Sequence, residues 1–395
     1  MSRNVPKLRF KGFEDEWIKY KADDLFINIS DKKHNGELNV LSVTQDKGVL
    51  LREELEIDIK FDIESVKNYK RVKAGDFIIS LRSFQGGFEI SNQEGLISPA
   101  YTVFNFKDSE KFNSKYFSYI FKSSRFIKKL AGLIYGVRDG KAISFTDFKT
   151  MTFFCPSLQE QEKIANFLSK VDSIIEKQEK KVQYWNSYKK GMMQKIFSQK
   201  IRFKDENGMD YPEWKINKIE NIATIEMGFT PSTKNDEAWN GNIEWLSIAG
   251  MNSKYIYSGN KKISSEILGK RKLVPIDTLI MSFKLTIGRL AIVKKEIVTN
   301  EAICQFYWKS KDISNEYMYA YLSVINIESF GCRAAKGITL NTESLNSIVV
   351  KLPCLEEQTK IANFLSNIDN IIEKESKKLE ELKQWKKGLL QQMFV

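Results

Sequence analysis

The chain has 395 residues, of which 42 % are hydrophobic and 12 % aromatic, so it can build more than one globular domain and is not a disordered polypeptide. Lysine and arginine outnumber aspartate and glutamate by 62 to 50, and the resulting net charge of +12 favours a polyanionic partner. The sequence contains no apolar run near the ~18 residues of a membrane span, so we expect no membrane contact. Its four scattered cysteines predict neither a disulfide framework nor a metal site, and we expect a cytoplasmic protein.

The first 155 residues predict an α+β domain with a strand-rich core. Short runs of β-forming residues are bounded by turn residues, as at 38–43. The turn at 74–76 (Ala-Gly-Asp) leads directly into a further predicted strand at 77–80. Amphipathic helical periodicity follows near residues 115–130.

A long helix is predicted over residues 156–200. Ser157 and Glu160, behind Pro156, have the spacing of a capping box at its start. Apolar residues then recur in alternating steps of three and four, a period that is typical of a coiled-coil seam. The predicted seam residues of this helix are Ile164, Leu168, Val171, Ile175, Val182 and Trp185.

The second half of the chain repeats the plan of the first. Leu-Arg-Phe-Lys at 8–11 is echoed by Ile-Arg-Phe-Lys at 201–204, and the whole segment 156–197 recurs without a gap at 353–394. A repeat this long indicates an internal duplication, so we expect a pseudo-two-fold molecule. The predicted divisions are a first globular domain at 1–155, a central helix at 156–200, a second globular domain at 201–352 and a C-terminal helix at 353–395.

The second globular segment predicts the same α+β class from a different sequence. A turn at 275–277 (Pro-Ile-Asp) leads to a predicted strand at 278–282, in the place of the strand at 77–80 in the first half. A further β-forming run covers 302–308, and a short amphipathic helix is predicted near 314–325.

The C-terminal helix is expected to pair with the central helix. Its predicted seam residues are Ile361, Leu365, Ile368, Ile372, Leu379 and Leu382. Two seam positions are polar in both copies, Gln178 and Lys189 against Glu375 and Lys386, which indicates either a device that sets the register or a solvated turn. Because the ends of a compact domain lie close together, the second helix must pack back along the first, antiparallel to it. About 40 helical residues span roughly 60 Å, so we expect the pair to hold the two domains over separate parts of one DNA duplex.

Residues suited to catalysis are scarce. The chain has a single histidine, His34, which excludes a site built from several histidines, and we expect no Ser-His-Asp triad. The segment 136–142 resembles a phosphate-binding loop but is one residue short and ends in alanine, where serine or threonine should hold magnesium. No glycine-rich turn for a dinucleotide or a methyl donor is present. We therefore predict that the chain is not an enzyme and binds no metal.

The repeated Glu-Gln-x-Lys-Ile-Ala-x-Phe-Leu segments at 160–168 and 357–365 strongly resemble those of specificity subunits of type I restriction–modification systems. Further stretches that match this family lie at 41–49, at 98–101 and at 228–232, where the motif is Gly-x-Thr-Pro-Ser. The resemblance covers essentially the full length. It implies two globular target recognition domains and two long antiparallel helices that act as a coiled-coil spacer between them.

The resemblance also implies a role in a restriction system, which is an anti-phage defence. The subunit is expected to recognise a bipartite, asymmetric site in double-stranded DNA and to dock two methyltransferase subunits that modify adenine at N6. An endonuclease and translocase subunit is expected to join through them, and S-adenosylmethionine, ATP and Mg²⁺ are expected on these partners and not on this chain. The alternatives are a nucleic-acid-binding coiled-coil scaffold outside restriction–modification and an enzyme hidden in one globular domain.

Candidate DNA-binding residues follow from side-chain chemistry. Arginine and lysine read guanine, asparagine and glutamine read adenine, and Lys, Arg, Ser and Thr hold phosphates. In each half a loop after a predicted strand carries such donors, at equivalent places but with different sequences, as two unlike half-sites require. The candidates are Tyr69, Lys70, Arg71, Arg82, Ser83, Gln85, Arg138 and Lys141 in the first domain and Thr233, Lys234, Asn235, Lys254, Lys284, Thr286, Arg289, Arg333 and Lys336 in the second. For each single residue, a solvated surface charge is the alternative interpretation.

Overall fold

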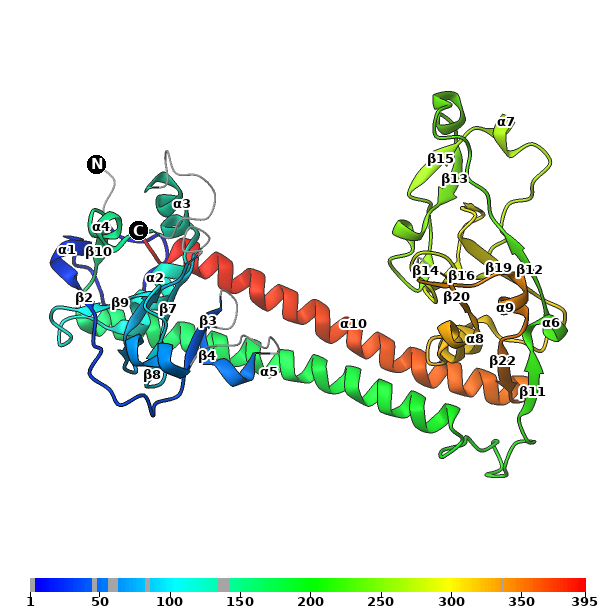
Figure 1. Cartoon of the computed structure of the whole chain (residues 1–395), viewed down its shortest axis with the longest axis horizontal. Coiled ribbons are helices and arrows are strands. Elements are labelled where there is room, and N and C mark those ends of the chain that lie inside the picture. Colours follow the sequence, from blue (N-terminus) through cyan, green and yellow to red (C-terminus); the bar gives the residue numbers. More distant parts are fainter. Residues whose placement is uncertain (1–3, 45–47, 56–62, 82–85, 134–142, 335–336) are drawn as a thin grey trace. The chain divides into compact units, whose positions relative to one another are not determined.

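The computed structural model of the chain describes residues 4–44, 48–55, 63–81, 86–133, 143–334 and 337–395 (Figure 1). Its contacts divide the chain into two compact units, Met1–Lys180 with Ser376–Val395, and Lys181–Glu375. The division falls inside the two long helices, α5 (Leu158–Phe197) and α10 (Leu355–Gln392). Each unit therefore contains one globular domain, the first turns of the helix that follows it, and the last turns of the other helix.

The first unit is built on a four-stranded antiparallel sheet. Its order is β2 (Phe26–Ile29), β9 (Thr102–Phe106), β6 (Phe77–Ile79) and β7 (Phe88–Ile90). The remaining strands pair as β1 (Ile18–Lys21) with β10 (Thr152–Cys155), β3 (Leu41–Thr44) with β4 (Gly48–Leu51), and β5 (Lys70–Val72) with β8 (Gly95–Ile97). The helices are α1 (Ala22–Leu25), α2 (Ser114–Lys122), α3 (Ser124–Leu133), α4 (Phe145–Lys149), and the 3₁₀ turns η1 (Arg52–Glu54) and η2 (Ile63–Asn68).

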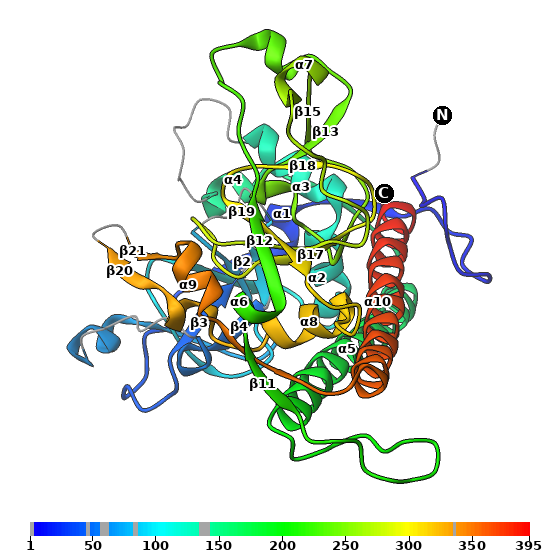
Figure 2. The ribbon, with the colours of Figure 1, turned by 90° about the vertical axis from the view of Figure 1, so that its right-hand side faces the viewer.

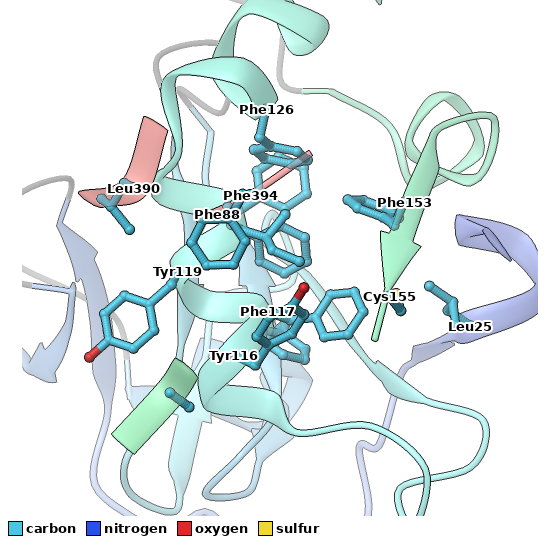
Figure 3. Close-up of a cluster of buried hydrophobic side chains, with 14 of the residues drawn as sticks. Leu25, Phe88, Tyr116, Phe117, Tyr119, Phe126, Phe153, Cys155, Leu390 and Phe394 are labelled. Carbon is cyan, nitrogen blue, oxygen red and sulfur yellow. The ribbon is translucent and has the colours of Figure 1, made fainter. Parts of the chain in front are cut away.

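The core of the first unit is rich in phenylalanine. Rings from the sheet stack edge to face on rings from α2, for example Phe26 on Phe117 with centroids 5.4 Å apart. The end of α10 completes this core, because Leu390 and Phe394 point into it (Figure 3) and Phe394 lies 5.4 Å from the ring of Tyr116. The predicted helical region at 115–130 forms two helices, which are broken at Ser123, whose hydroxyl donates to Ile120 O and accepts from Phe126 N.

The second unit repeats the central sheet of the first and extends it. The order is β12 (Ala223–Met227), β19 (Ile303–Trp308), β16 (Leu279–Ser282), β17 (Leu290–Val293) and β14 (Tyr255–Ile256), the last pair being parallel. A second sheet has the order β15 (Lys261–Ile263), β13 (Ile243–Leu246), β18 (Val298–Thr299), and two further pairs join β11 (Lys215–Lys218) to β22 (Val349–Leu352) and β20 (Cys332–Ala334) to β21 (Gly337–Thr339). The helices are α6 (Ile219–Ile222), α7 (Ser265–Leu268), α8 (Asn315–Leu322) and α9 (Thr342–Asn346), with 3₁₀ turns η4 (Asp236–Trp239), η5 (Ile248–Gly250) and η6 (Ile327–Phe330).

Gly228, in the Gly-x-Thr-Pro-Ser motif, lies where two backbones of the second unit touch. A Cβ at this position would lie 1.9 Å from Thr299 O, so only glycine fits. The motif thus marks the point where the chain leaves β12 and passes close against β18. This close approach explains why the motif begins with glycine.

The two long helices run antiparallel within each unit. In the first unit Asp172 of α5 pairs with Lys386 of α10 at 2.6 Å. In the second unit the same pair occurs with the roles exchanged, between Lys189 of α5 and Asp369 of α10 at 2.5 Å. Lys189 and Lys386 are the lysines that interrupt the predicted seam, and their matched ion pairs favour the register interpretation. The expected α+β fold with a duplicated plan and two long antiparallel helices is confirmed.

All predicted seam residues except Val182 lie in or pack against the two hydrophobic cores. Those with less than a tenth of their surface exposed are Ile164, Leu168, Val171, Ile175, Ile361, Leu365 and Ile368. The partly buried ones are Val182, Trp185, Ile372, Leu379 and Leu382. The first four residues of each seam join the core of the globular domain that precedes the helix, so each helix start is packed into its own domain. The predicted domain limits themselves stay a prediction.

Candidate nucleic-acid interface

The first globular domain is fixed to the start of α5 by residues of the repeated segments. The guanidinium of Arg9 donates two hydrogen bonds of 2.8 Å to the carboxylate of Glu160, which is only 1 % exposed. Gln161 accepts from Asn113 N at 3.0 Å and donates to Pro156 O at 3.0 Å. Only half of the predicted capping box therefore forms, because Ser157 Oγ accepts from Glu160 N while the carboxylate of Glu160 bonds Arg9.

The second unit repeats this arrangement with the matching residues. Arg202 donates to the fully buried carboxylate of Glu357 at 2.9 and 3.3 Å, and Gln358 accepts from Ser314 N at 2.9 Å. In this way α8 lies against the first turns of α10 (Figure 2). The carboxylate hydrogen bonds raise the pKa of both Arg9 and Arg202. The strongest sequence repeats thus form the junction between domain and helix, which both units need.

One difference separates the two junctions. In the second unit Trp214 Nε1 donates to Glu357 at 2.9 Å and the hydroxyl of Tyr317 donates to Lys351 O at 2.6 Å. In the first unit the corresponding polar atoms, Trp17 Nε1 and the hydroxyl of Tyr116, are buried and find no hydrogen-bond partner among the described residues. Burial raises the pKa of Tyr116 far above its usual value, so its hydroxyl stays protonated.

The candidate DNA-binding residues of the first domain that the structure describes are engaged with the protein. Tyr69 is buried, with 7 % of its surface exposed. Lys70 Nζ donates to Tyr101 O at 2.7 Å, and burial lowers its pKa. Arg71 forms an ion pair of 2.6 Å with Glu94 on the surface. The other candidates of this domain, Arg82, Ser83, Gln85, Arg138 and Lys141, lie outside the described residues.

The candidates of the second domain fall into separate places. Thr233, Lys234 and Asn235 are exposed between β12 and η4, where the side chain of Asn235 caps η4. The ammonium of Lys254 instead pairs with Glu316 at 2.7 Å and donates to Ser366 of α10 at 3.4 Å, so it helps to fix the domain on the helix. Arg333 lies on β20, and Lys336 is outside the described residues.

The structure brings three predicted candidates together on one loop. Lys284, Thr286 and Arg289 are exposed on the connection between β16 and β17, an antiparallel hairpin. Arg289 Nη1 donates to Ile248 O at 3.0 Å, which fixes the base of this loop. The matching strands of the first unit, β6 and β7, form the equivalent hairpin. The strands that flank the two predicted loops therefore occupy equivalent places in the two units, while residues 82–85 of the first loop lie outside the described residues.

Sequence reasoning missed an exposed face of the long helices that is the same in both copies. In the first unit Lys163 Nζ lies 5.4 Å from the ring centre of Phe10, which packs edge-on against Phe167. In the second unit Lys360 lies 5.6 Å from the ring of Tyr211, and Phe203 packs on Phe364. The sequence signal for this face is that residues outside the apolar seam are identical in the two repeats. These residues are Lys163, Asn166, Phe167, Ile174 and Lys177 in α5 and Lys360, Asn363, Phe364, Ile371 and Lys374 in α10.

The described residues hold no group of three His, Cys, Asp or Glu side chains that could bind a metal ion. The thiols of Cys155 and Cys304 are buried, and burial raises the pKa of each to about 12, so neither is a nucleophile near neutral pH. No helix in the described part of the chain is long and apolar enough to cross a membrane.

Comparison with known proteins identifies the family. A family model described as the type I restriction modification DNA specificity domain matches the chain twice, over residues 14–183 and 211–384. Because the two matches cover most of the chain, the chain belongs to this family, as the repeated segments predicted. Each match takes in one globular domain and most of the helix that follows it.

Curated relatives agree with the family model. The specificity subunit of the type I restriction enzyme MjaIX from Methanocaldococcus jannaschii is 29 % identical over 191 residues, which are 46 % of this chain and 44 % of that protein. The MjaVIII specificity subunit of the same organism is 26 % identical over 262 residues, 62 % of this chain and 61 % of that protein. The chain thus aligns with about half of the first relative and about three fifths of the second.

Solved structures share the fold over nearly the whole chain. One match is a chain from a structure that concerns the complex assembly and conformational transition of the type I restriction–modification system. It aligns with a TM-score of 0.60 at 14 % identity, and the alignment covers 96 % of this chain and 97 % of that chain. The S subunit of M. genitalium aligns with a TM-score of 0.56 at 14 % identity over 99 % of both chains. At this identity the likeness extends to the fold alone.

Proposed function

We propose that this chain is the sequence-reading subunit of a type I restriction–modification complex, in which each globular domain recognises one half of a bipartite, asymmetric site in double-stranded DNA. The observation that carries the proposal is the contrast between the two kinds of residue in each unit. The junctions of Arg9 with Glu160 and Arg202 with Glu357 are kept in both halves. The strand pairs β6–β7 and β16–β17 have equivalent places in their sheets but differ in sequence. A shared frame with unlike reading surfaces suits a site whose two halves differ.

The chemistry of the second hairpin fits base and phosphate contacts. Arg289 can donate to the O6 and N7 atoms of guanine, and Lys284 and Thr286 can hold phosphates. The net charge of +12 adds a sequence-independent attraction that weakens as salt rises. In this proposal the charge brings the duplex to the surface and the hairpins select the sequence.

The matched face of the long helices is proposed to dock the methyltransferase subunits. Packing explains why buried residues such as Ile164 and Ile361 are alike in both copies. Packing does not explain why exposed residues such as Asn166 and Asn363 are alike, or why Ile174 leaves 47 % of its surface exposed. A partner that binds each unit in the same way explains both. Two equivalent faces then imply two copies of that partner.

The chemistry is proposed to reside on the partners. Methylation at adenine N6 would use S-adenosylmethionine held by the methyltransferase subunits, and translocation and cleavage would use ATP and Mg²⁺ held by the endonuclease subunit that joins through them. This chain would then supply the recognition of the DNA sequence and the scaffold for its partners, and would not be an enzyme by itself. Purified chain incubated with DNA and S-adenosylmethionine, without partners, is expected to yield no methylated product.

The proposal is tested by expressing the chain with its methyltransferase subunit and sequencing methyladenine in the cellular DNA. The expected result is one bipartite motif with unlike halves. Exchange of residues 1–155 for the corresponding domain of a related subunit should change only one half of that motif. Methylation without a motif, or a change in both halves, would contradict the proposal and favour a nucleic-acid-binding scaffold of another kind.

A further inference from the structure

The tip of the hairpin between β16 and β17 presents an unusual residue. Leu285 has 93 % of its surface exposed, more than any other large hydrophobic side chain in the described residues. Its backbone has φ = +64°, in the left-handed region, where a side chain with a Cβ is unfavourable and glycine is usual. Both the left-handed backbone and the exposed apolar side chain are unfavourable for folding, so the residue is better explained by a role in binding than by a role in stability.

The loop around Leu285 is held in shape from below. Ser282, which is fully buried, donates through its hydroxyl to Thr286 O and accepts at the same oxygen from Arg289 N at 3.1 Å. Gly288 has φ = +80° and donates through its backbone N–H to Ser282 O at 2.9 Å. The leucine is therefore carried on a braced turn, so its exposed position is built into the hairpin.

The charge around Leu285 is positive. Lys284 lies over the ring of Phe283, with Nζ 5.1 Å from the ring centre, and Arg289 closes the loop on the other side. The sequence has no aspartate or glutamate between Asp277 and Glu296. An apolar tip between two cations, with no nearby carboxylate in the sequence, fits a polyanion that also offers apolar surface. Duplex DNA has this combination, in its phosphates and in its base edges.

We propose that Leu285 is a base-contacting residue of the second recognition domain, which enters a groove of the duplex and makes an apolar contact with the bases while Lys284 and Arg289 engage the backbone and base edges. Leucine can pack on the methyl group of thymine or against a partly opened base step. The inference rests on the proposed function, and it assigns the contact to one side chain that the predicted polar readers did not include.

The test uses the full chain in complex with its methyltransferase subunits and a duplex carrying the motif that methyladenine sequencing identifies. Leu285→Ala removes the side chain and keeps the strained backbone. It is expected to weaken binding about tenfold, as the loss of a buried leucine contact implies, with no change in the slope of affinity against salt. Lys284→Ala should instead lower that slope by about one, because it removes a phosphate contact.

Two further variants separate a DNA contact from a structural role. Leu285→Gly relieves the backbone strain, so it should match or exceed the wild-type melting temperature and still bind the duplex about tenfold more weakly. Ile276→Ala is the matched control, because Ile276 is an isoleucine with 55 % of its surface exposed in the turn that precedes β16, and this variant should bind as the wild type does.

Three results would overturn the inference. The first is equal DNA binding by Leu285→Ala and Ile276→Ala. The second is a melting temperature of Leu285→Gly well below that of the wild type. The third is loss of the methyltransferase from the Leu285→Ala complex, which would show that the leucine makes a protein contact. Failure of the wild-type complex to select any motif would instead refute the proposed function, so the two failures are distinct.

Discussion

Replacing Tyr116 and Tyr317 by phenylalanine, one at a time, should change the stability of the two units in opposite directions. Both rings are fully buried at matching junctions between α2 or α8 and a long helix. The hydroxyl of Tyr317 donates to Lys351 O at 2.6 Å, so Tyr317→Phe loses a hydrogen bond and should cost about 1 kcal/mol. The hydroxyl of Tyr116 has no partner in the described residues, so Tyr116→Phe removes an unsatisfied polar group and should stabilise its unit by about 1 kcal/mol.

Hydrogen–deuterium exchange read by mass spectrometry is the suitable assay, because it reports the opening free energy of each unit separately in a chain that contains two. Peptides from β9 and α2 report on the first unit, and peptides from β19 and α8 report on the second. Each substitution should leave the peptides of the other unit unchanged, which provides an internal control. Destabilisation of the first unit by Tyr116→Phe, equal to that of the second unit by Tyr317→Phe, would refute the reasoning and show that the Tyr116 hydroxyl is satisfied.

Three further predictions follow from contacts described above. Lys189→Asp should lower the stability of the second unit by about 1 kcal/mol by placing two carboxylates together, and adding Asp369→Lys should restore it in an unfolding titration. Gly228→Ala should destabilise the second unit by about 3 kcal/mol or more, since its Cβ would lie 1.9 Å from a carbonyl oxygen of β18, whereas Gly191→Ala, in open space on α5, should stabilise the helix by about 1 kcal/mol. The thiol of Cys304, whose pKa burial raises to about 12, should resist iodoacetamide at pH 8 in the folded chain and react on unfolding, as mass spectrometry can follow.

The long helices were predictable because their signal is redundant. Two copies of one segment carry the same apolar period, and helices α5 and α10 begin at equivalent residues, Leu158 and Leu355. Packing of Ile361 into its domain core holds the start of the second copy, as packing of Ile164 holds the start of the first. The local sequence pattern did not predict the hydrogen-bond partner of Glu160. This residue bonds Arg9, about 150 residues away in the chain, and so half of the predicted capping box does not form.

For the candidate DNA-binding residues, the sequence predicted the location of one loop correctly. Strand patterns placed the loop of Lys284, Thr286 and Arg289 after β16, where the structure has it. Donor chemistry does not indicate Leu285, because its exposure and backbone conformation are properties of the folded chain. A basic residue in a loop predicts a DNA contact at Lys254, whereas its ammonium bonds Glu316 and Ser366, partners that are distant in sequence.

The division of the chain inside its helices has a consequence for biosynthesis. The first unit needs residues 376–395, whose side chains Leu389, Leu390, Met393 and Phe394 fill part of its hydrophobic core. A ribosome makes these residues only after residues 181–375, so the core of the first unit is still incomplete when every residue of the second unit has been made. Because contacts over such long sequence separations form slowly, the half made first is expected to mature last and to depend most on chaperones.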